Sequence, residues 1–150
     1  MQAKMLNSDL LPVLFNVSEH VGPGKPNRAN DVSLVQFLMK KIGEHYPKYP
    51  QTLKTIIVDG RYGPKTAAAI IGCQNEWKKT QPTLNADGVV SPQQGTSPSY
   101  GGAVWSICQL NKSVKDKYMN QWPRMQDIPG CPGMLKQQCI QQTVGRTSLG

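Results

Sequence analysis

The sequence predicts an all-α fold in which three short helices pack around one core. Three segments place apolar residues at helical spacing, and two similar Asp-Gly turns separate them. The 14 glycines and 12 prolines favour short helices joined by tight loops over long bundles. A chain of 150 residues is long enough for one core and too short for two large domains, so we expect a single domain with decorated ends.

The first predicted helix follows a Gly/Pro-rich loop. Asn30 and Asp31 are good helix caps, and Gly43 supplies the stop. Between them, one apolar face is formed by Val32, Val35, Met39 and Ile42.

The second predicted helix begins at Pro64, a residue suited to the first helical position, and ends near Lys79. A tight turn precedes it, with Asp59, Gly60 and Gly63 as its structural residues. Asp87 and Gly88 repeat this plan after the helix, which an internal duplication explains most simply. Residues 103–110 have the spacing of a third helix.

These features divide the chain into an N-terminal arm and loop (1–30), a central domain (31–110) and a helical C-terminal extension (111–150). In the arm, the apolar run at residues 10–15 is expected to be a strand or a packing arm. It is too short for the core of a signal peptide. In the extension, the apolar stripe of Met134 to Val144 is expected to dock against the body or a second subunit.

The net charge of +8 favours a polyanionic partner: nucleic acid, an acidic lipid surface, or the carboxylate-bearing peptides of a bacterial wall. No block of basic residues occurs, and the cations do not alternate with exposed aromatics, so nucleic acid is the least expected. No segment reaches the apolar length of a membrane span.

No reaction centre is recognisable, and we expect no enzyme, cofactor or metal site. His20 and His45 lack the spacing of metal ligands. Asp59 and Asp87 are more readily explained as turn residues that cap backbone amides than as a catalytic acid pair. The cysteines form no CxxC pair, so buried thiols are the first interpretation and a disulfide between Cys131 and Cys139 is the alternative; the four are Cys73, Cys108, Cys131 and Cys139.

Three motifs in order resemble the peptidoglycan-binding domain family over about residues 22–110. They are Asp31-Val32-x-x-Val35-Gln36-x-Leu38, then Val58-Asp59-Gly60-Arg61-Tyr62-Gly63-Pro64-x-Thr66-x-x-Ala69-Ile70-x-x-x-Gln74, then Leu84-x-x-Asp87-Gly88-Val89-Val90-Ser91-Pro92. The resemblance implies a compact three-helix bundle built from two pseudo-repeats, which anchors to the bacterial cell wall and cuts nothing. The chain departs from the family at Cys73, at Ser91, and in an apparent insertion at 93–102.

The candidate ligand-binding residues surround the first turn and the second helix: Arg61, Tyr62, Thr66, Gln74 and Trp77. Arg61 is expected to pair with a carboxylate of a wall peptide, and Tyr62 or Trp77 to stack on a sugar. A solvated arginine and a packed tyrosine are the alternative at the turn. Gln36 and Gln74 are equally consistent with interhelical hydrogen bonds.

The chain offers neither a catalytic domain nor a standard signal peptide. We therefore expect an accessory subunit of a phage tail, a baseplate, a contractile injection particle or a wall-lytic assembly, associated with a particle or delivered to the wall. Residues 111–150 would contact other subunits, or a second copy in a homo-oligomer. The alternative is a structural adaptor that keeps this fold and mediates assembly without binding the wall.

Overall fold

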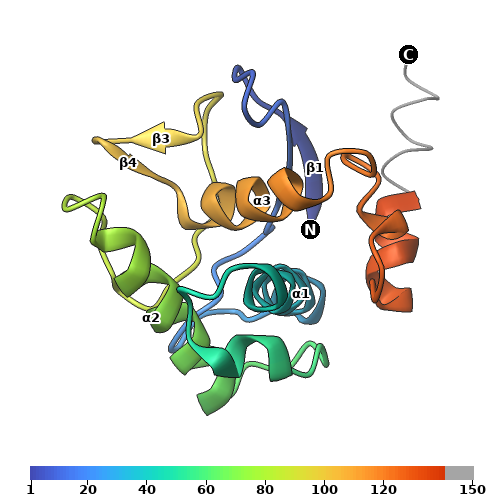
Figure 1. Ribbon diagram of the computed structural model, residues 1–150, viewed down its shortest axis with the longest axis horizontal. Coiled ribbons are helices and arrows are strands. Elements are labelled where there is room, and N and C mark those ends of the chain that lie inside the picture. Colours follow the sequence, from blue (N-terminus) through green and yellow to red (C-terminus); the bar gives the residue numbers. More distant parts are fainter. Residues whose placement is uncertain (141–150) are drawn as a thin grey trace.

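A computed structural model describes residues 1–140, and within them the expectation of an all-α bundle is wrong. Four α-helices are accompanied by two small antiparallel sheets of two strands each, so the fold mixes α and β structure (Figure 1). In chain order the elements are β1 (Gln2–Met5), β2 (Val13–Asn16), α1 (Ala29–His45), the 3-10 helix η1 (Gln51–Thr55), α2 (Pro64–Lys78), β3 (Ser99–Tyr100), β4 (Ala103–Val104), α3 (Ser106–Lys117), the 3-10 helix η2 (Met125–Asp127) and a helix at 133–140.

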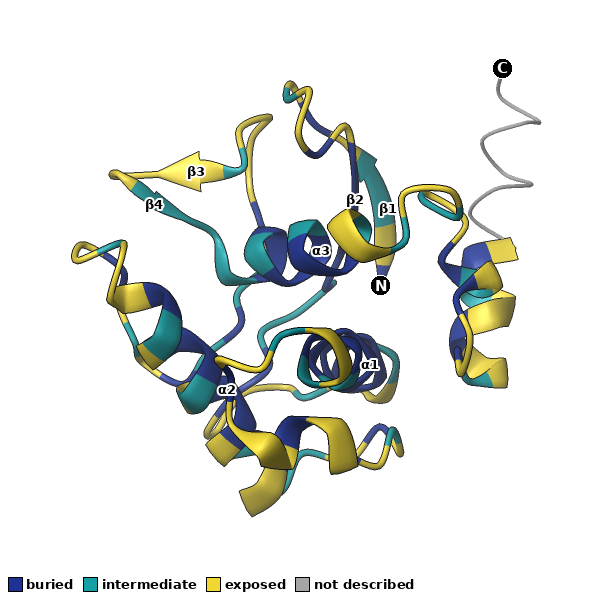
Figure 2. Cartoon of the chain, in the orientation of Figure 1, coloured by how far each residue is buried: buried dark blue, intermediate teal, exposed yellow. Residues whose placement is uncertain are grey.

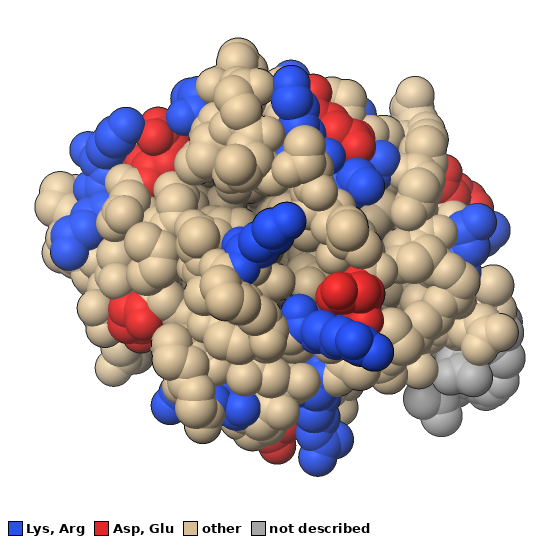
Figure 3. Space-filling view, turned by 90° about the horizontal axis from the view of Figure 1, so that it is seen from below, with Lys and Arg blue, Asp and Glu red and all other residues tan. Residues whose placement is uncertain are grey.

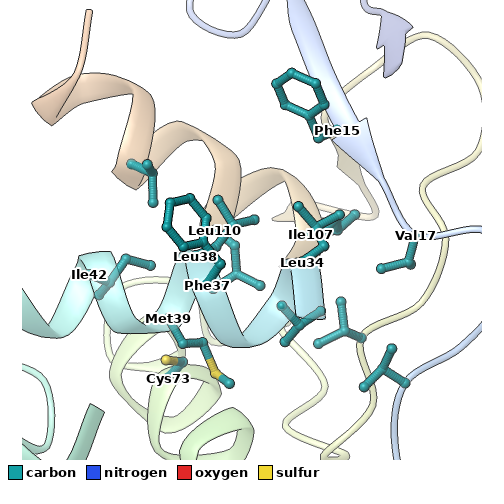
Figure 4. Packing of buried hydrophobic residues seen from close by; sticks show 14 of the residues in the cluster. Phe15, Val17, Leu34, Phe37, Leu38, Met39, Ile42, Cys73, Ile107 and Leu110 are labelled. Atoms are coloured by element: carbon teal, nitrogen blue, oxygen red, sulfur yellow. The ribbon is translucent and has the colours of Figure 1, made fainter. Parts of the chain in front are cut away.

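Helix α1 lies at the centre of the molecule and is buried along most of its length (Figure 2). It packs against α3, η1 and α2. Leu38 of α1 faces Leu110 of α3, and Met39 meets Cys73 of α2 (Figure 4). All four side chains are fully buried or nearly so, which places them in the part of the core that stabilises the fold most.

The ends of α1 differ from those expected. The helix begins at Ala29, and no side chain caps its first amides. Asp31 is fully buried, and its Oδ1 accepts hydrogen bonds from the Met1 amino group and from the backbone N–H of Ser18, both at 2.9 Å. Gly43 does not end the helix, which runs on to His45. A Cβ on Gly43 would lie 2.6 Å from Leu53 Cβ, so its glycine allows η1 to pack closely on α1.

Strand β2 confirms the expectation of a strand at the apolar run 10–15, and it pairs with β1 in register from Gln2 with Asn16 to Met5 with Val13. On the side of β2 away from β1, the side chain of Asn111 in α3 forms the backbone hydrogen bonds that a neighbouring strand would form. Its Oδ1 accepts from the Phe15 N–H at 2.8 Å, and its Nδ2 donates to the Phe15 carbonyl at 3.0 Å. One buried amide side chain therefore fastens the N-terminal arm to α3.

Helix α2 begins at Pro64, as predicted, and ends one residue before Lys79. Helix α3 begins at Ser106, three residues later than expected, because Ala103 and Val104 form β4 and pair with β3. Strand β3 and the turn after it belong to the segment 93–102 that the sequence marks as an insertion, and β4 follows directly. Gln93 anchors this segment from a buried position, since its Nε2 donates to the carbonyls of Gln94, Gly95 and Ser97.

The C-terminal helix at 133–140 docks on the body of the same chain through Leu135 and Cys139, which belong to the single buried cluster. That cluster draws on all three segments that the sequence distinguishes. Residues 141–144 of the predicted apolar stripe lie outside the described residues. None of the helices in the described part of the chain is long and apolar enough to cross a membrane.

Candidate functional site: a groove beside the first Asp-Gly turn

The two Asp-Gly turns are built in the same way, as their sequences predict. Asp59 Oδ1 accepts a hydrogen bond from the Arg61 N–H at 2.9 Å, and Asp87 Oδ1 accepts one from the Val89 N–H at 2.9 Å. Gly60 and Gly88 follow with φ of 73° and 76°, in the region that favours glycine. Both aspartates therefore cap backbone amides, which confirms their interpretation as turn residues.

A glutamine side chain on a preceding α-helix forms hydrogen bonds with the backbone of each turn. Gln36 Oε1 accepts from the N–H groups of Asp59 and Gly60 at 3.1 and 3.0 Å. Gln74 Oε1 accepts from the Gly88 N–H at 2.8 Å, and its Nε2 donates to the Val89 carbonyl at 3.0 Å. Both glutamines are buried, so their amides connect the helices to the turns and are not available to a ligand.

An open groove of about 640 Å³ lies beside the first turn, in the size range of small-molecule and peptide sites. Its lining comes from η1, from the loop at 56–63, from the first turns of α2 and from one residue of α1. Its lining residues are Gln36, Thr52, Thr55, Ile56, Ile57, Asp59, Arg61, Gly63, Pro64, Lys65, Thr66, Ala68 and Ala69.

Two cations and one anion line this groove. Arg61 and Lys65 are exposed, and the ion pairs of the described residues include neither. The pKa of Asp59 is lowered, first by the hydrogen bond from the Arg61 backbone and then by that from Gln36, so its carboxylate is charged at neutral pH. The charge of Arg61 lowers this pKa slightly as well, although Arg61 forms no ion pair in the described residues. The groove therefore carries one net positive charge.

The groove also exposes apolar surface. Ile57 lines the groove and is 74% exposed, so it offers apolar surface to a ligand. Ala68 on α2 is an exposed residue of the same lining, and Ile56 is a buried one. A ligand that combines a carboxylate with small apolar groups would meet complementary groups along this groove.

Of the five candidate ligand residues, Arg61 and Thr66 line the groove. Thr66 is buried, and its hydroxyl accepts from Gln36 Nε2 at 3.0 Å, so it contributes to the wall more than to recognition. Gln74 is the support of the second turn. Tyr62 packs half-buried against the core and lies outside the groove.

The stacking role expected of Trp77 is not supported by its position. Trp77 is 4% exposed, and its Nε1 donates to the Tyr49 hydroxyl at 2.7 Å. Sequence reasoning missed Ile57, Lys65 and the η1 residues Thr52 and Thr55. The two adjacent isoleucines before the first turn could have indicated this surface. In an extended segment neighbouring side chains point to opposite sides, so one isoleucine of such a pair faces solvent.

In the described part of the chain, both histidines contact hydroxyl groups of the protein, and the cysteines are buried. His20 Nδ1 lies 3.0 Å from Ser91 Oγ, and His45 Nε2 lies 2.7 Å from the Tyr118 hydroxyl. The four cysteines are buried thiols, and Cys131 and Cys139 form no disulfide. Burial raises the pKa of Cys73, Cys108 and Cys139 to about 12 and that of Cys131 to about 11, so none is activated as a nucleophile. Residues 1–140 contain no group of three potential metal ligands.

Lysines and arginines are spread over the molecular face shown in Figure 3, with acidic residues between them. On this face the cations attract anions in general, and they form no continuous basic stripe there.

Comparison with known protein families, with curated proteins and with solved structures gives no significant match. The resemblance of the three motifs to peptidoglycan-binding domains therefore stays a prediction.

Proposed function

We propose that this protein is a non-catalytic binding module whose ligand is bacterial peptidoglycan, held in the groove beside the first Asp-Gly turn. The observation that carries the proposal is the unpaired Arg61 guanidinium at the edge of a groove with apolar walls. The turn that presents Arg61 is held by Gln36, so the cation projects from a fixed backbone.

The peptide portion of peptidoglycan matches this chemistry. It is short, it carries free carboxylates, and its alanine residues offer methyl groups. Arg61 can form two parallel hydrogen bonds with one carboxylate, which is the strongest pairing available to a surface cation. Lys65 would add a second, less directional attraction, while Ile57 and Ala68 would contact the methyl groups.

The alternative proposal is a structural adaptor that would join other subunits through exposed apolar side chains. Leu10 is 65% exposed and Met119 is 67% exposed, outside the groove. Apolar side chains of this exposure mark protein contacts when they gather in a patch. A subunit of a phage tail or injection particle, contacted through 111–150, stays a prediction from the sequence.

Sedimentation with purified sacculi tests the proposal. We expect the protein to be retained at low salt, and Arg61→Ala to release it. Arg28→Ala is the matched control, because Arg28 is also exposed and its loss changes the net charge equally, yet it lies outside the groove. Equal retention of the two variants would contradict a specific site, and no retention of the unmodified protein would favour the adaptor.

A further inference from the structure

The β3–β4 hairpin and the loop at 83–91 enclose a second, smaller groove of about 230 Å³ beside the second Asp-Gly turn. The hairpin projects from the body at the end of α3, and the loop that follows α2 lies opposite it (Figure 1). Both residues of β3 in this hairpin are exposed (Figure 2). From the segment 93–102, which the sequence marks as an insertion, Tyr100 contributes to this lining.

Two aromatic rings line this groove. Tyr100 is 80% exposed, and its ring centroid lies 6.2 Å from that of half-buried Trp105, at an interplanar angle of 42°. In the described residues neither the Tyr100 hydroxyl nor the Trp105 indole N–H has a protein partner. Both rings therefore present an apolar face together with a polar group that a ligand can bond.

The backbone under this aromatic pair is fixed in place. The Trp105 N–H donates to the Pro98 carbonyl at 3.0 Å, and the Val104 N–H donates to Gln81 Oε1 at 2.8 Å. The hairpin is thus tied to its own base and to the end of α2. Little conformational freedom has to be lost when a ligand binds such a platform.

The polar groups opposite the rings are small and carry only one charge. Asp87 is the one carboxylate among the residues that line the groove, and no lysine, arginine or histidine lies there. Its Oδ1 is occupied by the Val89 N–H, and its Oδ2 lies 3.5 Å from the Asn85 Nδ2. Thr83 and Ser91 add hydroxyls. This set offers donors and acceptors to hydroxyl groups, and it contains no cation for a carboxylate or phosphate.

We propose that this second groove is a carbohydrate site that takes one pyranose ring of a neutral glycan. The negative face of an aromatic ring attracts the weakly positive C–H groups on the flat side of a pyranose. Tyr100 and Trp105 supply that face, while Asp87 and Asn85 bond the hydroxyls at the edge of the sugar. The assignment is independent of the proposed function of the first groove, because the two sites share no lining residue.

A soluble tetramer of β-1,4-linked N-acetylglucosamine tests the site without any peptide. Titration calorimetry on the full chain should show binding at millimolar concentration, and Tyr100→Ala should weaken it about tenfold. Trp105→Phe should weaken it as well and abolish the change in tryptophan fluorescence on binding. Tyr100 is so exposed that its removal should leave thermal unfolding unchanged, which keeps the test valid even if Trp105→Phe destabilises the protein.

Arg61→Ala serves as the control, since it changes the first groove and should leave binding of the tetramer unaltered. Absence of binding by the unmodified protein, or equal affinity of Tyr100→Ala, would overturn the carbohydrate site. Loss of tetramer binding in Arg61→Ala would also overturn it, because the sugar would then occupy the first groove. Retention on sacculi is scored separately, so failure of one proposal is distinguishable from failure of the other.

Discussion

Gln36 of α1 accepts a hydrogen bond from the backbone N–H of Gly60 at 3.0 Å, and this contact ties the central helix to the turn that presents Arg61. Gln74 of α2 makes the same contact with Gly88 at 2.8 Å. At both turns a buried glutamine thus satisfies a backbone amide of an Asp-Gly pair. Each groove lies beside one of these turns, so its position depends on the glutamine that holds the turn.

Replacement of Gln36 by leucine should lower the free energy of unfolding by about 2–4 kcal/mol. The substitution leaves the buried N–H of Gly60 and the partly buried N–H of Asp59 without acceptors, and a buried N–H without an acceptor costs about 1–3 kcal/mol. Urea unfolding followed by circular dichroism measures the change. Gln137→Leu, at an exposed position of the C-terminal helix, is the control and should stay within about 0.5 kcal/mol. A similar small effect of Gln36→Leu would show that the glutamine does not hold the turn.

Substitution of Gly60 by alanine should be more harmful than the same change at Gly95. Both glycines have positive φ, of 73° and 77°, so alanine costs about 1–2 kcal/mol of backbone strain at either position. At Gly60 the new Cβ would also lie 2.9 Å from Ser33 Oγ and 3.0 Å from the Ala29 carbonyl, whereas at Gly95 it would meet open space. We expect an additional loss of about 1–3 kcal/mol for Gly60→Ala from this overpacking. Equal unfolding midpoints of the two variants would contradict the close approach of the turn to α1.

The protein should lose stability as the pH rises from about 9 to 12. Burial raises the pKa of Cys73 from 9.0 to about 12 and that of Tyr49 from 10.0 to about 12. In that range the unfolded chain loses protons that the folded chain keeps, so each rise in pH favours unfolding. The slope is at most about 1.4 kcal/mol per pH unit for each group.

Urea unfolding under reducing conditions at several alkaline pH values measures this slope. Cys73→Ala should make it shallower by up to about 1.4 kcal/mol per pH unit between pH 9 and 12, because one of the shifted groups is removed. The same slope in both proteins would mean that Cys73 titrates normally and is not buried as described.

The features predicted correctly from the sequence depend on local geometry. Pro64 at the start of α2 is one case, since a proline at the first helical position forms no clash and loses no hydrogen bond. The capping of amides by Asp59 and Asp87 is another, because the partners lie only two residues away. In both cases the chain neighbours alone decide the conformation.

The features that were missed depend on residues far apart in the sequence. Asp31 looks like a helix cap but binds the Met1 amino group, and β2 is completed by Asn111 from α3. Strands of two residues, as in the β3–β4 hairpin, have no detectable periodicity. Trp77 follows a helical spacing that is the same for a packed side chain and for a binding platform, so only the burial seen in the structure distinguishes the two.

Amide chemical-shift mapping by NMR, with a soluble disaccharide-peptide fragment of peptidoglycan as ligand, tests the central claim most directly. We predict that the largest shifts occur at Ile57, Arg61 and Lys65 on the groove beside the first turn, and that they vanish in Arg61→Ala. Shifts confined to residues outside both grooves, or no shifts at saturating ligand, would contradict the assignment of this protein as a wall-binding module.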